Sequence, residues 1–234
     1  WLKVGLVAHL TIAPIWCVCV RSTMSDVVKE DKELAEAKAA SALHDKFNAV
    51  CIPPIVVLTG FSLLQSTNRQ AQIHGILSWT TFAYVAADIV YNVLVPKCQP
   101  GPVRLGTILV HHFITLGLVL FPITNPNSGY LTAFCTVVEV NTVCQVLHKV
   151  TKWKPFQYGF LFTWFTMRLL WYPFLIWRFH REMMEMGYSP KDLPYLQTVG
   201  SQIALVGLNS FWTAEFLFSG KKKAAAKSAD GKKN

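Results

Sequence analysis

Two adjacent histidines, His111 and His112, lie in a stretch that is otherwise almost wholly apolar, ILVHHFITLGLVL (108–120). An imidazole can act as an acid or base, ligate a metal ion or serve as a hydrogen-bonding group. Acid–base chemistry would pair a histidine with a carboxylate, and Asp88 and Glu139 both lie in other apolar stretches. Burial disfavours a charged imidazole, so a hydrogen-bonding role is the simplest interpretation.

We expect no metal ion and no cofactor apart from a bound lipid. His, Asp and Glu would suit zinc or iron, but the sequence contains no H-x-x-x-H, E-x-x-H or H-x-x-H-H spacing. The six cysteines include no C-x-x-C pair. They are interpreted as small buried hydrophobic residues.

Arg168 is a cation in the middle of an aromatic-rich apolar stretch, WKPFQYGFLFTWFTMRLLWYPFLIWRF (153–179). A charge at the centre of a bilayer costs about 2.5–3.5 kcal/mol on insertion scales, so the arginine needs a reason to be there. We expect Glu139 or Asp88 to neutralise it. Helical spacing places Trp164 and Trp171 beside the guanidinium, where aromatic faces can shelter it.

The elements that carry these residues are predicted to be membrane-spanning helices. Only 15% of the residues are charged and the mean hydropathy is +0.34, both typical of a polytopic membrane protein rather than a soluble domain. Backbone groups in lipid must bond internally, so each span is a helix. The fold class is therefore all-α, a bundle of about seven spans at 4–20, 47–64, 73–95, 105–123, 129–148, 158–177 and 195–218.

Counting from the middle of each span places the buried charges in one layer of the bundle. His111 shares its helix face with threonines, whereas His112 lies between Ile108 and Leu116, so His111 is the better candidate for the polar face. The sequence predicts a buried polar network or lipid cavity formed by Asp88, His111, His112, Glu139, Asn141 and Arg168, with Tyr84, Thr115, Thr142, Trp164 and Trp171 around it.

The chain divides into four parts. Residues 1–20 are the first span, and 21–46 form a charged interfacial or soluble helix that Ser25 caps. Residues 47–218 are the main transmembrane domain, and 219–234 a basic, disordered tail. Most loop lysines and arginines fall on one side, which places the C-terminus on the cytosolic, matrix or stromal side. This distribution also explains the net charge of +9 without a nucleic-acid partner.

Five short motifs resemble the TLC domain superfamily, named for TRAM, Lag and CLN proteins, which includes ceramide synthases. The motifs follow one another as S-A-L-H (41–44), A-D-I-V-Y (87–91), H-H-F-I-T (111–115), V-E-V-N-T (138–142) and F-T-M-R-L-L (165–170). The resemblance implies a helical membrane domain around a lipid-accessible cavity. Ceramide synthases also carry an H-D-x-x-D element on the following span, where this chain has E-V-N-T instead. The E-V-N-T sequence resembles the form found in the non-synthase branch of the superfamily. Members of that branch are associated with lipid sensing, lipid trafficking and membrane composition.

Three functions remain open from the sequence. The leading hypothesis is a non-enzymatic TLC-like protein that binds or senses a membrane lipid in its cavity. The second is a structural subunit of a larger mitochondrial or plastid membrane complex, which would contact other subunits through its lipid-facing surface or through residues 25–46. The third is a lipid acyltransferase related to ceramide synthase. The resemblance implies an endomembrane location, and the second hypothesis an organellar inner or thylakoid membrane.

Overall fold

The described chain is almost wholly helical, with short turns between the helices. The computed structural model describes the backbone of residues 2–64 and 70–230, and the side chains of residues 31–64 and 72–218. No strand forms in these backbone ranges, so the all-α fold class is confirmed.

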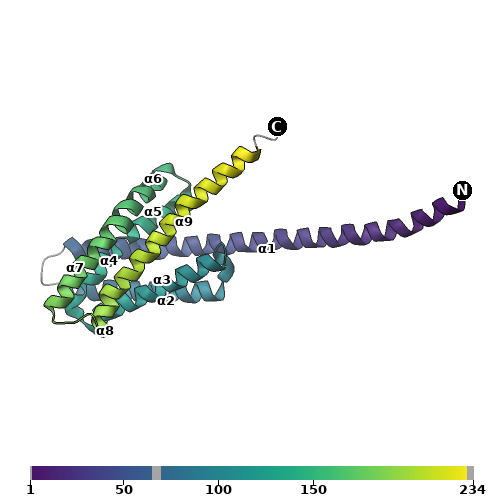
Figure 1. Ribbon diagram of the computed structural model, residues 1–234. Helices are drawn as coiled ribbons and strands as arrows, with labels where there is room; N and C mark the ends of the chain where they lie inside the picture. The colour runs from purple at the N-terminus through teal and green to yellow at the C-terminus, as the bar shows by residue number, and fades with distance from the viewer. Residues whose placement is uncertain (1, 65–69, 231–234) are drawn as a thin grey trace.

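The longest element is α1 (Leu2–Leu64), which runs past the rest of the bundle toward the N-terminus (Figure 1). The prediction that Ser25 caps a separate helix is wrong, because α1 continues through it. No glycine or proline lies between Pro14 and Pro53, and residues 25–46 are rich in the strong helix formers Ala, Glu and Lys. Nothing in this stretch therefore ends the helix.

Several further helices are apolar enough to cross a membrane. They are α2 (Gln70–Leu94), α3 (Pro102–Thr124), and the run formed by α6 (Lys154–Thr163), η3 (Trp164–Trp171) and α7 (Tyr172–Glu185). With the part of α1 from residue 31 onward, the described residues contain four such helices, or five if a bent pair counts as one span. That pair is the run Pro126–Thr136, which contains α4 (Tyr130–Thr136), and α5 (Glu139–Thr151), with a bend of 42° between them.

Two of the seven predicted spans are not among these helices. The span at 4–20 lies outside the residues whose side chains are described. The span at 195–218 is helical, through the end of α8 (Leu193–Tyr195), η4 (Leu196–Gly200) and α9 (Ser201–Asp230). Gln202, Asn209 and Glu215 make it more polar than the others. α9 also continues to Asp230, beyond the predicted start of disorder at 219, since alanine and lysine favour helix there.

The remaining described elements are short turns of helix between the long ones. η1 (Pro96–Cys98) joins α2 to α3, and η2 (Pro126–Ser128) joins α3 to α4. Each begins with a proline, whose fixed φ suits the first position of a helical turn.

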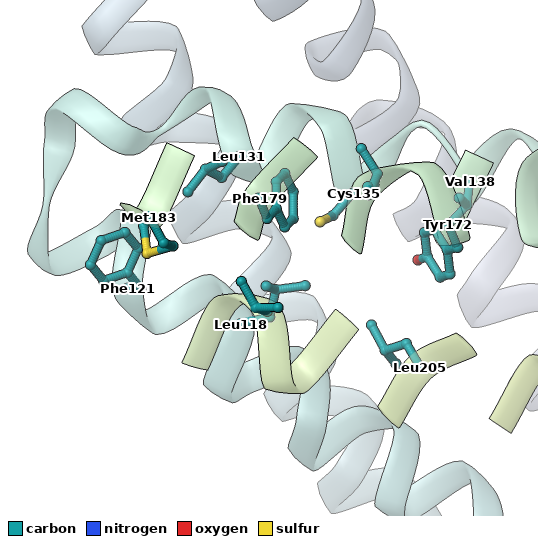
Figure 2. Packing of buried hydrophobic residues seen from close by; sticks show 11 residues of the cluster. Leu118, Phe121, Leu131, Cys135, Val138, Tyr172, Phe179, Met183 and Leu205 are labelled. Atoms are coloured by element: carbon teal, nitrogen blue, oxygen red, sulfur yellow. The ribbon is translucent and has the colours of Figure 1, made fainter. Parts of the chain in front are cut away.

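The main apolar core lies where α3, α4, α7 and α9 meet. Figure 2 shows Phe121 and Met183 at one end of this cluster and Tyr172 at the other, with Leu118 and Leu205 along its length. A smaller cluster of Ile55, Leu77 and Ala133 joins α1 and α2 to α4. α4 thus packs on both sides, and it ends immediately before the segment that carries Glu139 and Asn141.

Arg168 lies in η3, a π-helical segment of the run 154–185. The N–H of Tyr172 donates to the carbonyl oxygen of Met167, five residues earlier, instead of four. Pro173 follows directly and has no N–H to offer, which weakens the α-helical pattern at this point. Single π-helical turns are rare and occur frequently at functional sites.

Candidate functional site

One cavity of about 590 Å³ extends from the surface into the bundle. Exposed Lys38, Lys97 and Lys149 line its outer end, and apolar Leu118 and Leu205 line its inner wall. Between these ends the cavity wall carries most of the predicted site residues: Tyr84, Asp88, His111, His112, Thr115, Glu139, Thr142, Trp164 and Arg168.

The carboxylate of Asp88 lies between two histidines from other helices. Its Oδ1 is 2.6 Å from Nε2 of His44 on α1, and its Oδ2 is 2.7 Å from Nε2 of His112 on α3. The side-chain amide of Asn92 also donates to Oδ2, at 3.0 Å. Asp88 is only 2% exposed. These are short, buried, charge-assisted contacts, and one side chain of α2 thereby fastens α1 and α3.

The histidine of α3 that contacts the carboxylate is His112, which the helical spacing placed off the polar face. His111 packs edge-on against His112 and against Trp212 of α9, with ring centroids 5.4 Å apart in each case. The threonine at i+4 does not distinguish the two histidines, because both line the cavity. The Thr115 hydroxyl donates to the backbone oxygen of His111 in its own helix, and so needs no partner elsewhere.

Arg168 is held by neutral oxygens. Its Nε donates to Oδ1 of Asn141 at 2.9 Å, one terminal nitrogen to Oδ1 of Asn209 at 3.0 Å, and the other to the Thr142 hydroxyl at 3.2 Å. The Trp164 ring lies against the guanidinium, with its centroid 5.1 Å from the central carbon. The side chains therefore come from α5, α9 and η3 itself.

The predicted ion pair of Arg168 with Glu139 or Asp88 is wrong. Both oxygens of Asp88 are engaged by histidines. Glu139 lines the cavity and forms no ion pair or hydrogen bond with any residue whose side chain is described. It begins α5 directly after the bend from α4, and Asn141 and Thr142 on the following turn take the contacts with the arginine instead.

The other predicted residues serve different partners. Tyr84 donates its hydroxyl to Asn48 of α1 at 3.0 Å, and the Trp164 indole donates to Thr213 of α9 at 3.0 Å. Trp171 turns away from the cavity and donates to the backbone oxygen of Phe134 at 2.9 Å. The α-helical spacing that placed it beside Arg168 does not hold across a π-helical segment.

His44 was not among the predicted site residues. The sequence places it in the charged helix at 21–46, and most of residues 31–43 are indeed exposed. His44 itself is buried, because α1 reaches the bundle one turn earlier than the apolar pattern indicates. The available signal was its place in S-A-L-H, together with Asn48 one turn later on the same face.

The site can bind and orient a ligand, and its histidines could also exchange protons. Nδ1 of His111 and Nδ1 of His112 are buried and have no hydrogen-bond partner among the described side chains. No group of three or more His, Cys, Asp or Glu residues in this part of the chain is arranged to hold a metal ion. Polar groups that converge on a largely apolar cavity are typical of small-ligand sites.

Comparison with known proteins shows the family to which the chain belongs. Neither a curated protein nor a solved structure matches the chain. The TLC domain matches residues 51–217, which include every predicted site residue. The helical bundle and the apolar spans agree with an integral membrane protein of this kind. The chain therefore belongs to the TLC domain family.

Proposed function

We propose that this TLC-domain membrane protein binds a membrane lipid in its cavity and is not an enzyme. The observation that carries the proposal is the cavity itself: about 590 Å³, with an apolar inner wall and a few polar groups at mid-depth. Ligand sites of roughly 300–1,000 Å³ with this division of apolar and polar lining are common in proteins.

The arrangement of Asp88 favours a structural role for the charged layer. Two histidines and an asparagine occupy the carboxylate. A general base needs a lone pair within reach of the substrate, whereas this carboxylate is committed to three protein donors. Its contacts hold the helices that form the cavity wall, and so keep the lipid site in shape.

Bound lipid is the direct test. Protein purified in a mild detergent and measured by native mass spectrometry should carry one lipid per chain. Val85→Trp places a large ring in the cavity wall and should displace the lipid, while Val90→Trp, on the exposed side of the same helix, should not. Val90 is 56% exposed, so the control adds equal bulk outside the cavity. Lipid that is absent from the wild type, or that survives Val85→Trp, contradicts the proposal.

A lipid acyltransferase is the second candidate, and the contact of His112 with Asp88 favours it. A carboxylate that orients an imidazole at a cavity wall is the arrangement that acid–base catalysis requires. His112→Ala, and separately His111→Ala, should then abolish turnover of an acyl-CoA while bound lipid is retained. If no turnover is measured with the wild type, or the variants only lower thermal stability, the enzyme hypothesis fails.

A further inference from the structure

Arg168 has hydrogen-bonding capacity left over. A guanidinium carries five N–H donors. Three have acceptors, on Asn141, Asn209 and Thr142. One N–H on each terminal nitrogen therefore remains without an acceptor among the described side chains. Two such donors, one on each nitrogen, match the two oxygens of a carboxylate or phosphate.

Arg168 also has charge left over. It is only 8% exposed and lines the cavity, and its acceptors are neutral. Two other cations of the cavity wall have acidic partners: Lys97 lies 3.0 Å from Glu36, and Lys149 lies 2.8 Å from Asp45. A buried charge without a counter-ion is costly. A negative group in the cavity would remove that cost.

We propose that the counter-ion of Arg168 is the acidic group of a single-chain lipid, a carboxylate or a phosphate, bound in the cavity. This inference rests on the proposed lipid-binding function and specifies its ligand. The acidic group accepts from the two free N–H donors, and the Trp164 ring fixes the plane of the guanidinium. The chain of the lipid lies along the apolar wall formed by Leu118, Val119 and Leu205.

The cavity contains three acidic residues that bear on this choice: Asp45, Asp88 and Glu139. Lys149 neutralises Asp45, and the two histidines hold Asp88. Glu139 has no ion-pair partner among the described residues, so its carboxylate would repel an anionic ligand. Glu139→Gln should therefore increase the retention of an acidic lipid. If Glu139 were instead the counter-ion of Arg168, the wild type would not prefer an acidic lipid, and the preference would emerge only in Glu139→Gln.

The experiment compares three probes of equal chain length on the full chain stripped of lipid: oleic acid, oleoyl lysophosphatidic acid and oleyl alcohol. Competition against a fluorescent single-chain lipid gives the relative affinities. Oleic acid or lysophosphatidic acid should bind at least about tenfold more tightly than the alcohol, as expected for charge-assisted hydrogen bonds. The stronger of the two acids identifies the headgroup.

Variants of two arginines test which residue causes the preference for an acidic lipid over oleyl alcohol. Arg168→Gln should remove the preference for an acid over oleyl alcohol, and Arg168→Lys should keep only part of it, because lysine lacks the two parallel donors of a guanidinium. Arg104→Gln removes another cation of the cavity wall and should keep the preference. The wild-type comparison alone tests the proposal if the Arg168 variants fail to fold.

Equal binding of acid and alcohol by the wild type would overturn the anionic ligand while leaving lipid binding intact. A preference that survives in Arg168→Gln, or that Arg104→Gln removes, would also overturn it. Failure of all three probes to bind would refute the lipid-binding function as well.

Discussion

Oδ2 of Asp88 lies 2.7 Å from Nε2 of His112, and this contact joins α2 to α3 inside the bundle. The other oxygen of the same carboxylate contacts His44 of α1. One side chain thus links three successive long helices. The carboxylate that makes these contacts belongs to a side chain that is only 2% exposed.

Asp88→Asn should destabilise the protein by about 3 kcal/mol, since it leaves two buried imidazoles facing a neutral amide. Chemical denaturation in detergent measures the change. Asp45→Asn is the control, because Asp45 pairs with exposed Lys149 and such pairs contribute little. Equal effects of the two substitutions would show that the Asp88 contacts are not structural.

His44→Ala and His112→Ala should each destabilise, and their effects should not add. Both histidines serve the same carboxylate, so the loss of one changes the value of the other. A double-mutant cycle on thermal stability gives the coupling, expected at about 1 kcal/mol. His180→Ala, at an exposed position on α7, is the matched histidine control. Strict additivity would argue against a shared partner.

Asn141→Ala should lower the free energy of unfolding by roughly 2–3 kcal/mol, because it leaves the buried, charged Nε–H of Arg168 without its acceptor. Asn209→Asp should instead be tolerated, since it keeps the acceptor for Arg168 and adds a counter-ion, and the amide nitrogen of Asn209 has no hydrogen-bond partner to lose among the described residues. Denaturation midpoints of the two variants test this pair. A greater loss in Asn209→Asp than in Asn141→Ala would contradict the surplus charge assigned to Arg168.

Gly129→Ala should destabilise the junction of α2 and α4. A Cβ at this position would collide with the Cβ of His74, and neither backbone can shift without moving its helix. Gly60→Ala is the control, because a Cβ there meets nothing within 4 Å. Thermal melting should separate the two variants by several degrees. Equal melting would show that the two helices are not this close.

Cys98, between α2 and α3, should react slowly with a thiol reagent. Burial raises the pKa of its thiol, and a thiol with a raised pKa forms the reactive thiolate only at higher pH. Maleimide labelling should therefore rise at a higher pH than that of a cysteine introduced at exposed Lys97. Identical pH profiles for the two sites would contradict the burial of Cys98.

Much of the fold could be predicted from the sequence, because apolar length and the cost of burying charge are local properties. From those properties the sequence predicts that Asp88, His112 and Arg168 lie in one buried layer, and all three line the cavity. The same properties could not say which charge meets which, since pairing depends on the rotation of each helix about its axis. An acidic partner for Arg168 was the expected solution on general grounds, yet two asparagines took that place. A serine before an acidic turn favours the start of a helix, but it does not end a helix that already precedes it. The unbroken run of helix formers therefore carries α1 through Ser25.

The π-helical turn around Arg168 has a consequence for how this domain can change over generations. Such a turn holds one residue more than the α-helical turn that it replaces, so the helix on either side keeps its facing. Loss of one residue between Trp164 and Trp171 would leave a regular helix in which Tyr172, Phe179 and Met183 still face the core. Only the residues inside the turn would rotate, and Arg168 is one of them. A deletion in this segment would therefore remove the polar site and spare the fold.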